Sequence, residues 1–575
     1  MTDPTDTPDA VTPGAAGAVP SPRRSSALVA AGILTSRVAG LARERAIANY
    51  MGVGPAVDAF RAALRIPNLL QNLLGEGVLS ASFIPVYARL VGAGDDEEAG
   101  RVAGAVAGLL AALAGVLVVI GVVFARPLAV ALTPGFTGDR LDLTVTLIRI
   151  LTPGVGFLVL SAWCLGVLNS HRRFFLPYVA PVLWNAAQIA VLVALGVGGA
   201  GQRSLAVALA WGTFAGGALQ LAVQLPAVRA VAGQVRLSLR TDLAGVRTAV
   251  RQFVPVVAGR GVVQLSSYVD LLLASLLAVG AVAALGYAQI FYLLPVSVFG
   301  MSVAAAELPE LSRLGDTDRS RARARLDEGA GRIAFYVIPT AVAYLVLGDL
   351  VVGALLRTGR FGVEESRLVW YVLAAYTVGL LATTTGRLLQ NGLYAMGDAR
   401  TPAIAAAVRV AVAAGLGIVL MFQLDRVVVE GAGLAGLERT ADLPALLGPL
   451  PEAVRSSPTA GLRLGAAGLA LGAAVSAWVE LAILRRRVES VLGPTRLGGG
   501  HLPRTVAGAL AAGAVAVALR ALVDGLHPVL GLGIAGLPAA VTYLLAARAL
   551  GVPEAAVLGR GLRTRLTSLT QRRRW

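Results

Sequence analysis

The sequence predicts an all-α membrane protein that crosses the bilayer many times. Of its 575 residues, 56% are hydrophobic and only 14% are charged, and the mean hydropathy is +0.73. A soluble chain carries about a quarter charged residues, so much of this chain must lie in lipid. Apolar runs of spanning length recur, the cleanest being VAGAVAGLLAALAGVLVVIGVVF at 102–124. Each matches the roughly 20 residues that cross a bilayer core.

Taken in order, the chain begins with a lead at 1–26, rich in Pro, Thr, Asp and Ala, that we expect to be disordered and cytoplasmic. A signal peptide is not favoured after it, because charges interrupt the next apolar segment. About fourteen spans follow, near 27–49, 58–90, 102–124, 143–168, 177–199, 204–228, 250–279, 282–312, 333–350, 368–396, 402–423, 461–484, 505–524 and 528–549.

The arginine-rich loops alternate along the chain. They include HRRF (171–174), 229–247, RSRARAR (319–325), LRRR (484–487) and the tail QRRRW, whereas most loops between them are poorer in arginine. Because cytoplasmic loops carry an excess of positive charge, we expect both termini to be cytoplasmic. The loop at 357–367, with three arginines, fits this pattern least well.

The chain also repeats itself. SFIPVYARL (82–90) resembles AELPELSRL (306–314) at an offset of 224 residues, and the turns ending at Pro177 and Pro402 are offset by 225. Two parallel six-helix lobes are therefore predicted, a plan known from transporters with a site between the repeats. The expected domains are the lead 1–26, an N-terminal lobe 27–245, a C-terminal lobe 246–490 with an outward loop 424–460, two extra helices in 491–550, and a basic cytoplasmic tail 551–575.

Span two carries polar side chains on one helical face. At 100° per residue, the following lie within a sector of about 80°: Asp58, Arg61, Arg65, Asn68, Asn72 and Glu76. A charge at the bilayer centre costs about 2.5–3.5 kcal/mol on insertion scales, so we interpret the row as the wall of a water-filled cavity. The structural alternative is ion pairs that hold helices together, or arginines that reach the interface.

Other spans add polar groups to this expected cavity. Span one carries Arg37, Arg43 and Glu44, and in span seven Arg260 shares a face with Gln264, with Asp270 near its edge. The excess of arginine predicts an anionic cargo such as a phosphate, because guanidinium groups bind phosphate oxygens bidentately. The substrate-binding cavity is thus expected to contain Arg37, Arg43, Asp58, Arg61, Arg65, Glu76 and Arg260.

Several function classes are not favoured. The net charge of +17 comes from arginines at the ends of apolar runs, a placement typical of the positive-inside rule rather than of nucleic-acid binding. One cysteine and three scattered histidines offer no disulfide and no catalytic metal cluster. We find no phosphate-binding P-loop, and no cofactor is expected. An enzyme is therefore not expected.

Specific stretches then become recognisable. SRVAGLARE (36–44), DAFRAALRIPNLL (58–70) and GEGVLSASFIPVYARL (75–90) resemble the opening of the MurJ (MviN) family of bacterial lipid II flippases. Further resemblance lies in LPYVAPVLWN (176–185), QLPAV (224–228), ELPELSR (307–313) and GDARTP (397–402). The resemblance covers the first twelve spans and, more weakly, the last two. This family belongs to the multidrug/oligosaccharidyl-lipid/polysaccharide exporter superfamily, which is built from two six-helix lobes.

The resemblance implies a transporter of the bacterial inner membrane. It would move lipid II, an undecaprenyl-pyrophosphate disaccharide-pentapeptide, to the outer leaflet for cell-wall synthesis. Its partners would be lipid II, membrane lipids and proteins of cell-wall synthesis. Arg37, Arg43, Asp58 and Glu76 match family functional positions. The chain departs from the family after PNLL, where Gln71 and Asn72 replace an arginine pair, and in span eight, where Gln289 and Ile290 replace an Asp–Arg pair.

The expected mechanism is alternating access, in which the lobes rock about a central cavity. Arg260 is expected to replace the cation missing at Ile290; the alternative is that it pairs with Asp270 or another acid and only holds helices together. Energy would come from the membrane potential or a monovalent cation, with Asp270 and Asp398 as candidate cation ligands. The alternatives in function are an exporter of another lipid-linked saccharide or amphiphile, an intramembrane lipid-modifying enzyme, and a non-transporting scaffold for cell-wall enzymes.

Overall fold

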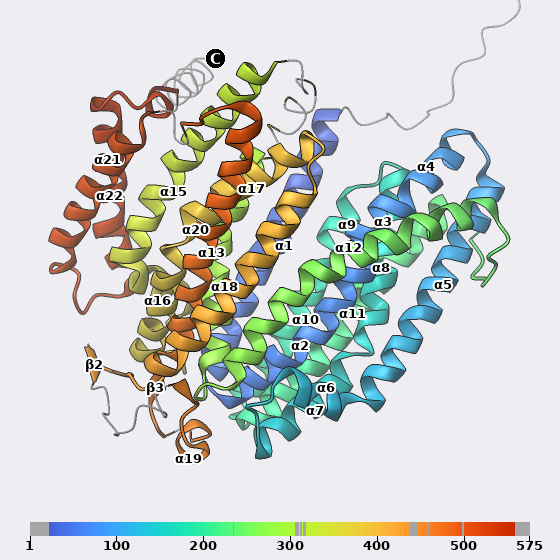
Figure 1. Cartoon of the computed structure of the whole chain (residues 1–575). Coiled ribbons are helices and arrows are strands. Elements are labelled where there is room, and N and C mark those ends of the chain that lie inside the picture. Colours follow the sequence, from blue (N-terminus) through green and yellow to red (C-terminus); the bar gives the residue numbers. More distant parts are fainter. Residues whose placement is uncertain are drawn as a thin grey trace, which may run out of the picture.

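The computed structural model is a bundle of long helices with two distinct ends (Figure 1). It describes residues 22–233, 235–304, 307, 310, 313, 318–431, 433–435, 447–457, 459–496 and 500–557, with the backbone alone for 22–28, 258–267, 433 and 435. One end, where the first helix begins and the last ends, is called the termini end. The opposite end carries a small sheet and is called the sheet end.

The N-terminal bundle comprises the first eleven helices. They are α1 (Pro22–Met51), α2 (Pro55–Leu74), α3 (Glu76–Ser82), α4 (Ile84–Gly92), α5 (Asp96–Val123), α6 (Ala125–Leu132), α7 (Gly138–Leu151), α8 (Gly154–Ser170), α9 (Phe175–Val179), α10 (Pro181–Val197) and α11 (Gln202–Val231). Within it, α1 packs on α10 and α9, α2 on α7, and α8 on α11. Helix α1 begins inside the predicted lead, and residues 1–21 lie outside the described residues.

The C-terminal bundle follows the long helix α12 (Ala244–Ser275). It comprises α13 (Ala281–Pro295), the π-helix η1 (Val296–Met301), α15 (Arg319–Leu356), α16 (Val363–Thr377), α17 (Leu380–Ala395), α18 (Arg400–Leu424) and α20 (Gly465–Leu492). Helix α12 touches both bundles, packing along α2 and α3 and also meeting α13, α18 and α20. Helices α21 (Leu502–Arg520) and α22 (Pro528–Ala549) pack on each other and on α15.

The predicted outward loop contains structure of its own. Between α18 and α20 lie β1 (Val428–Glu430), β2 (Gly433–Ala435), α19 (Glu452–Arg455) and β3 (Leu462–Arg463). The strands form an antiparallel sheet in the order β2–β1–β3, with Val428 opposite both Ala435 and Arg463.

Local sequence explains where several helices begin and bend. The Asp95 side chain accepts a hydrogen bond from the Glu98 amide and caps α5, the usual role of an aspartate before a helix. Pro295 ends regular α-helical bonding at the start of η1, because proline has no N–H to donate and π-bulges accommodate such breaks. Span two, predicted as one helix, is broken at Gly75 and Phe83.

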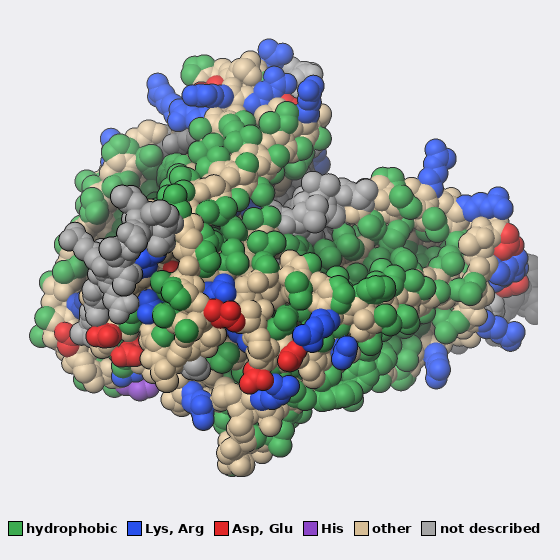
Figure 2. Space-filling view, turned by 60° about the horizontal axis from the view of Figure 1, so that its bottom comes forward, with side chains coloured by type: hydrophobic (Ala, Val, Ile, Leu, Met, Phe, Trp, Pro, Cys, Tyr) green, Lys and Arg blue, Asp and Glu red, His purple; other side chains and the backbone are tan. Residues whose placement is uncertain are grey.

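The fold class predicted from the sequence is confirmed: the chain is an all-α polytopic membrane protein. Eleven helices of the described chain are long and apolar enough to cross a membrane, or up to twelve if α16 and α17, which meet at 46°, form one span. Helices α1 and α12 are not among them, so the number of fourteen stays a prediction. Figure 2 shows charged side chains at the ends of the molecule and hydrophobic surface along its sides, as a lipid-facing protein requires.

Three hydrophobic clusters hold the molecule together. The largest includes residues of α1 and α2 together with residues of α13, α15–α18 and α20, so it joins the two bundles. A second lies within the N-terminal bundle around Phe83, Trp163 and Leu168. The third fastens α21 and α22 to α15 around Phe335 and Tyr543. The two extra C-terminal helices are therefore packed onto the C-terminal bundle.

Candidate functional site between the two bundles

Two arginines share one buried carboxylate near the sheet end. Nη2 of Arg43 lies 2.6 Å from Oε1 of Glu44, and Nη2 of Arg61 lies 2.7 Å from Oε2 of the same side chain. Glu44 is only 8% exposed. The site thus joins α1 to α2 by charge-assisted hydrogen bonds, which are about twice as strong as neutral ones. Two cations around one anion leave a net positive charge.

Arg61 also reaches from the N-terminal bundle to the C-terminal bundle. Its guanidinium carbon lies 4.2 Å from the centre of the Tyr287 ring on α13, a cation–π contact. Gly286 gives it room, because a Cβ atom there would lie 2.6 Å from Nη1 of Arg61. Arg61 of the N-terminal bundle therefore covers the surface of α13 one turn before Gln289 and Ile290.

Some buried N–H donors at the arginine site have no acceptor in the described part of the chain. Nε of Arg43 and Nε of Arg61 are buried and have no hydrogen-bond partner among the described residues, and the same is true of Nε1 of Trp184 on α10. Trp184 belongs to the same site, since the Arg43 guanidinium carbon is 5.0 Å from its ring centre. Buried donors without acceptors are costly, and an anionic oxygen is the kind of group that would satisfy them.

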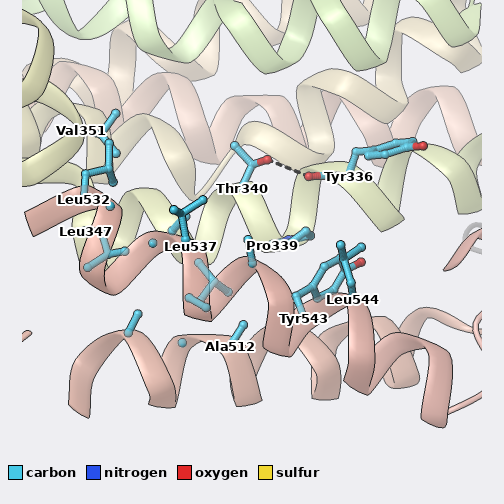
Figure 3. A pocket seen from close by; sticks show the side chains of 18 of the residues that line it. Tyr336, Pro339, Thr340, Leu347, Val351, Ala512, Leu532, Leu537, Tyr543 and Leu544 are labelled. Atoms are coloured by element: carbon cyan, nitrogen blue, oxygen red, sulfur yellow. Dashed lines mark hydrogen bonds between the residues drawn. The ribbon is translucent and has the colours of Figure 1, made fainter. Parts of the chain in front are cut away.

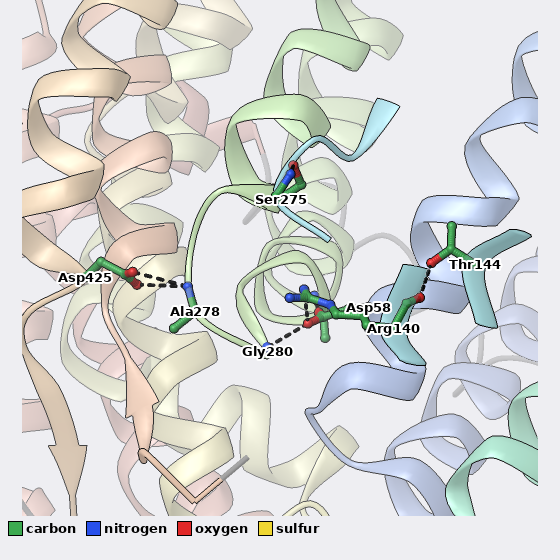
Figure 4. A network of polar contacts seen from close by, with 9 residues as sticks. Asp58, Arg140, Thr144, Ser275, Ala278, Gly280 and Asp425 are labelled. Carbon is green, nitrogen blue, oxygen red and sulfur yellow. Dashed lines mark hydrogen bonds and ion pairs between the residues drawn. The ribbon is translucent and has the colours of Figure 1, made fainter. Parts of the chain in front are cut away.

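Asp58 has a different place from the one expected. Its buried carboxylate accepts hydrogen bonds of 2.7 Å from the amides of Gly280 and Ala283 and pairs with Arg140 at 2.6 Å (Figure 4). It caps the first turn of α13 from the opposite bundle, where a carboxylate also meets the positive end of the helix dipole. Gly280 has φ +93°, a conformation that favours glycine.

The remaining predicted cavity residues do not all join this site. Arg65 is half-buried on α2, and its carbonyl accepts a hydrogen bond of 2.9 Å from the Tyr268 hydroxyl of α12. Arg37 is exposed on α1. Glu76 is exposed at the start of α3, after the break at Gly75, so one continuous helix does not carry the whole predicted row from Asp58 to Glu76. The side chain of Arg260 lies outside the described residues.

The two candidate cation ligands lie apart. Asp270 is half-buried on α12. Asp398 precedes α18 at the termini end, where it binds Thr401 and Arg487. The hydrogen bonds from Thr401 and Arg487 lower the pKa of Asp398 to about 2. Among the described residues, no three His, Cys, Asp or Glu side chains converge as a metal site.

A second polar cluster lies inside the C-terminal bundle. Glu480 of α20 is buried and accepts hydrogen bonds of 2.7 Å from Gln390 of α17 and from Arg409 of α18. Each of these residues lies within an apolar span, which accounts for their mutual pairing, because unpaired charges are costly there. The sequence analysis did not single out Glu480 or Arg409.

An apolar cavity of about 690 Å³ lies between α15 and the two C-terminal helices (Figure 3). Its walls include Tyr336 and Leu347 of α15, Ala512 of α21, and Leu537 and Tyr543 of α22. Their side chains offer hydrocarbon and aromatic surface, so the cavity suits an apolar chain rather than a charged group.

Sequence reasoning missed residues that complete the site. Trp184 lies in an apolar helix, where an aromatic residue is ordinary, and Arg140 lies at the start of a span, where a charge is ordinary. Trp184 contacts Arg43, 141 residues away in the sequence, and Arg140 contacts Asp58, 82 residues away. Nothing in the local pattern predicts such pairings.

Fold and site together define a polytopic membrane transporter with an arginine site between two helix bundles. A solved structure described as lipid II flippase MurJ in an inward closed conformation matches with a TM-score of 0.68 at 20% identity, covering 91% of this chain and 99% of that one. An inward-facing multidrug resistance MATE transporter of the MOP superfamily matches with a TM-score of 0.56 at 18% identity, covering 81% and 98%. These likenesses concern the fold.

The sequence comparisons identify the family. The model of the family "Lipid II flippase MurJ" matches residues 47–436. A probable lipid II flippase MurJ of Rhizobium tropici is 34% identical over 392 residues, 67% of this chain and 73% of the relative. A lipid II flippase MurJ of Burkholderia cenocepacia is 33% identical, covering 72% of this chain and 80% of that one. The chain belongs to the lipid II flippase MurJ family.

Proposed function

We propose that this protein flips lipid II from the cytoplasmic to the outer leaflet by alternating access. The family membership supports the cargo, and one observation in the structure carries the residue assignment. Arg43 and Arg61 meet at Glu44 with two buried Nε donors unsatisfied, beside the unsatisfied Nε1 of Trp184. A pyrophosphate would supply acceptor oxygens for these donors, and guanidinium groups suit it because they bind phosphate bidentately.

Glu44 would hold the two arginines in place while no cargo is bound. Its carboxylate offsets part of their charge, since two buried like charges without a counter-ion would be strongly destabilising. When pyrophosphate enters, its negative charge can take over this role. Arg37, Arg65, Glu76 and Arg260 stay predicted members of the cavity, with Asp58 acting where the bundles meet.

The prenyl tail needs an apolar path separate from the charged site. The cavity between α15, α21 and α22 supports such a path, because its lining is apolar and it lies at the periphery of the C-terminal bundle. We propose that the tail runs there, in contact with lipid, while the headgroup crosses between the bundles. Each buried methylene contributes about 0.8 kcal/mol, which gives a long tail a strong preference for this surface.

The proposed orientation places the protein in the bacterial inner membrane with both termini in the cytoplasm and the sheet end outside. Arginine-rich loops at the termini end support it. In this orientation the described state is closed on the outside by Asp58 and Arg61. The membrane potential or a monovalent cation would supply energy, with Asp270 as the candidate cation ligand. Proteins of cell-wall synthesis are the predicted protein partners.

The test is complementation of a bacterium depleted of its own lipid II flippase. The chain should restore growth and outer-leaflet lipid II. Arg43→Ala and Arg61→Ala should each lower lipid II flipping about tenfold or more, since a hydrogen bond to a charged group contributes about 1.5–3 kcal/mol. Arg126→Ala is the matched control, because its ion pair with Asp142 is exposed and far from the site in sequence.

The outcomes separate the alternatives. Normal flipping by both arginine variants would contradict the arginine assignment. Growth without lipid II in the outer leaflet would favour a scaffold, and transport of a different lipid-linked saccharide would favour another exporter.

A further inference from the structure

The turn between α12 and α13 (residues 276–280) is held from two directions. Its last residue, Gly280, donates to Asp58 of the N-terminal bundle at 2.7 Å, as described above. The two preceding amides are also occupied. Ala278 donates to the carboxylate of Asp425 at 3.1 Å, and Val279 donates to the carbonyl of Arg455 at 3.1 Å. The three consecutive amides thus have acceptors from the N-terminal bundle on one side and from the loop after α18 on the other, and Figure 4 shows the bonds of Ala278 and Gly280.

The acceptors for Ala278 and Val279 come from one part of the chain, the described residues between 425 and 463, which we name the clamp segment. Asp425 directly follows α18, and Arg455 ends α19. The Arg455 guanidinium also donates to the carbonyl of Leu276, at 3.4 Å. The guanidinium of Arg463 in β3 donates a hydrogen bond of 3.2 Å to the carbonyl of Asp425, and this bond joins the two ends of the segment. Asp425 is 1% exposed, so its hydrogen bond with Ala278 is shielded from water.

The contacts with the N-terminal bundle depend on where this turn lies. Asp58 can bind Gly280 and Ala283 only if their amides point toward α2, and the Gly135 amide binds the hydroxyl of Ser275 at 3.2 Å. The turn packs tightly against the N-terminal bundle, because a Cβ atom on Gly280 would lie 2.7 Å from Val53. When the bundles part at the sheet end, the bonds to Asp58 must break, whereas those to Asp425 and Arg455 can persist.

We propose that the clamp segment sets the resting conformation of the transporter by presenting the α12–α13 turn to Asp58, and so keeps the sheet end closed. The segment makes no contact with the arginine site among the interactions described, so it acts on the conformational equilibrium rather than on the cargo. Removing the Asp425 carboxylate leaves the Ala278 amide without a partner, and removing the Arg455 guanidinium deprives the Leu276 carbonyl of its donor, so each change loosens the turn. The closed state needs the turn in place, so its stability then falls more than that of the open state. This inference rests on the proposed function only in assuming that the two bundles part.

The test measures distance, without lipid II. Spin labels at Ser204→Cys and Asp524→Cys, in a Cys164→Ala background, report the sheet end of each bundle; both sites are exposed and outside the clamp segment. In the full-length protein in nanodiscs, Asp425→Ala and Arg455→Ala should raise the ratio of long to short distances severalfold, up to about tenfold for the double variant. Asp425→Asn retains an acceptor oxygen and should keep the parent distribution.

Asp95→Ala is the matched control, because it removes an aspartate that also binds a backbone amide but lies at the termini end. An unchanged distribution in the double variant overturns the proposal, and so does an equal change in Asp95→Ala. If Asp425→Ala does not fold, Arg455→Ala decides alone, since its side chain is only partly buried. Failure of lipid II flipping in complementation leaves these distances untouched, so the two proposals fail separately.

Discussion

At the scale of single residues, ion pairs with aspartate and glutamate position the buried arginines. Glu44 gathers Arg43 and Arg61, and Asp58 engages Arg140. The charged residues within spans were conspicuous in the sequence because they interrupt apolar runs, so Arg43, Arg61 and Asp58 could be predicted as important. Their pairing could not, because helical periodicity places side chains on a face but does not say which distant helix that face meets.

Asp425 should make stability depend on pH. Burial raises the pKa of Asp425 to about 7, although Ala278, Arg463, Arg455 and Arg426 favour its charged form. Because the folded-state pKa lies above the unfolded value, the stabilisation is complete in acid and is lost as pH rises through about 7. The slope is at most about 1.4 kcal/mol per pH unit between about pH 4 and 7.

The measurement is the melting temperature of the purified protein from pH 5 to 8, compared with Asp425→Asn. As pH rises to about 7, the melting temperature of the parent protein should fall relative to that of Asp425→Asn. Above about pH 7 the difference in melting temperature should stay constant. Parallel curves throughout would show that Asp425 does not titrate in this range.

At the scale of elements, composition located the helices but not their breaks. All fourteen predicted ranges overlap helices of the structure. Span two nevertheless divides into α2, α3 and α4, and the predicted outward loop contains a three-stranded sheet. Apolar periodicity reports burial in lipid, whereas a break at Gly75 depends on local packing. A short sheet depends on pairing between segments with little apolar pattern, which a hydropathy argument does not detect.

The segment before α12 should depend on Gly104 of α5. A Cβ atom at Gly104 would lie 2.0 Å from the carbonyl oxygen of Arg236, so Gly104→Ala must push that segment away. The Ser238 amide, which donates to the Gly104 carbonyl at 3.3 Å, should then exchange its hydrogen at least tenfold faster in a hydrogen-exchange experiment. This corresponds to a loss of about 1.4 kcal/mol of local stability.

Gly115→Ala on the same helix is the control, since its Cβ atom would meet nothing within 4 Å. It should leave exchange at Ser238 unchanged. Equal rates in Gly104→Ala and Gly115→Ala would mean that this segment does not need the close approach.

At the scale of the whole molecule, the class of fold followed from composition and the family from short motifs. The bundles, however, meet through contacts that no short motif contains. Asp58 is 222 residues from Gly280 and Asp425 is 147 from Ala278. These contacts gather at one end of the molecule, which leaves the opposite end to open. A rocking transporter needs such an asymmetry, because only one side can be open at a time.

Orientation in the membrane completes this picture and can be measured directly. If arginine excess marks the cytoplasmic side, the termini end is inside, since Arg172 and Arg173 lie there with the arginines of 319–325 and 485–487. A reporter inserted after Gly94, or fused after Trp575, should be active only in its cytoplasmic form. One inserted after Ser456 in the clamp segment should be active only in its external form. The α21–α22 loop, probed at Asp524, should behave like Ser456, because both lie at the sheet end. The reverse pattern would place the closed end in the cytoplasm, and the described state would then be the one that releases cargo outside.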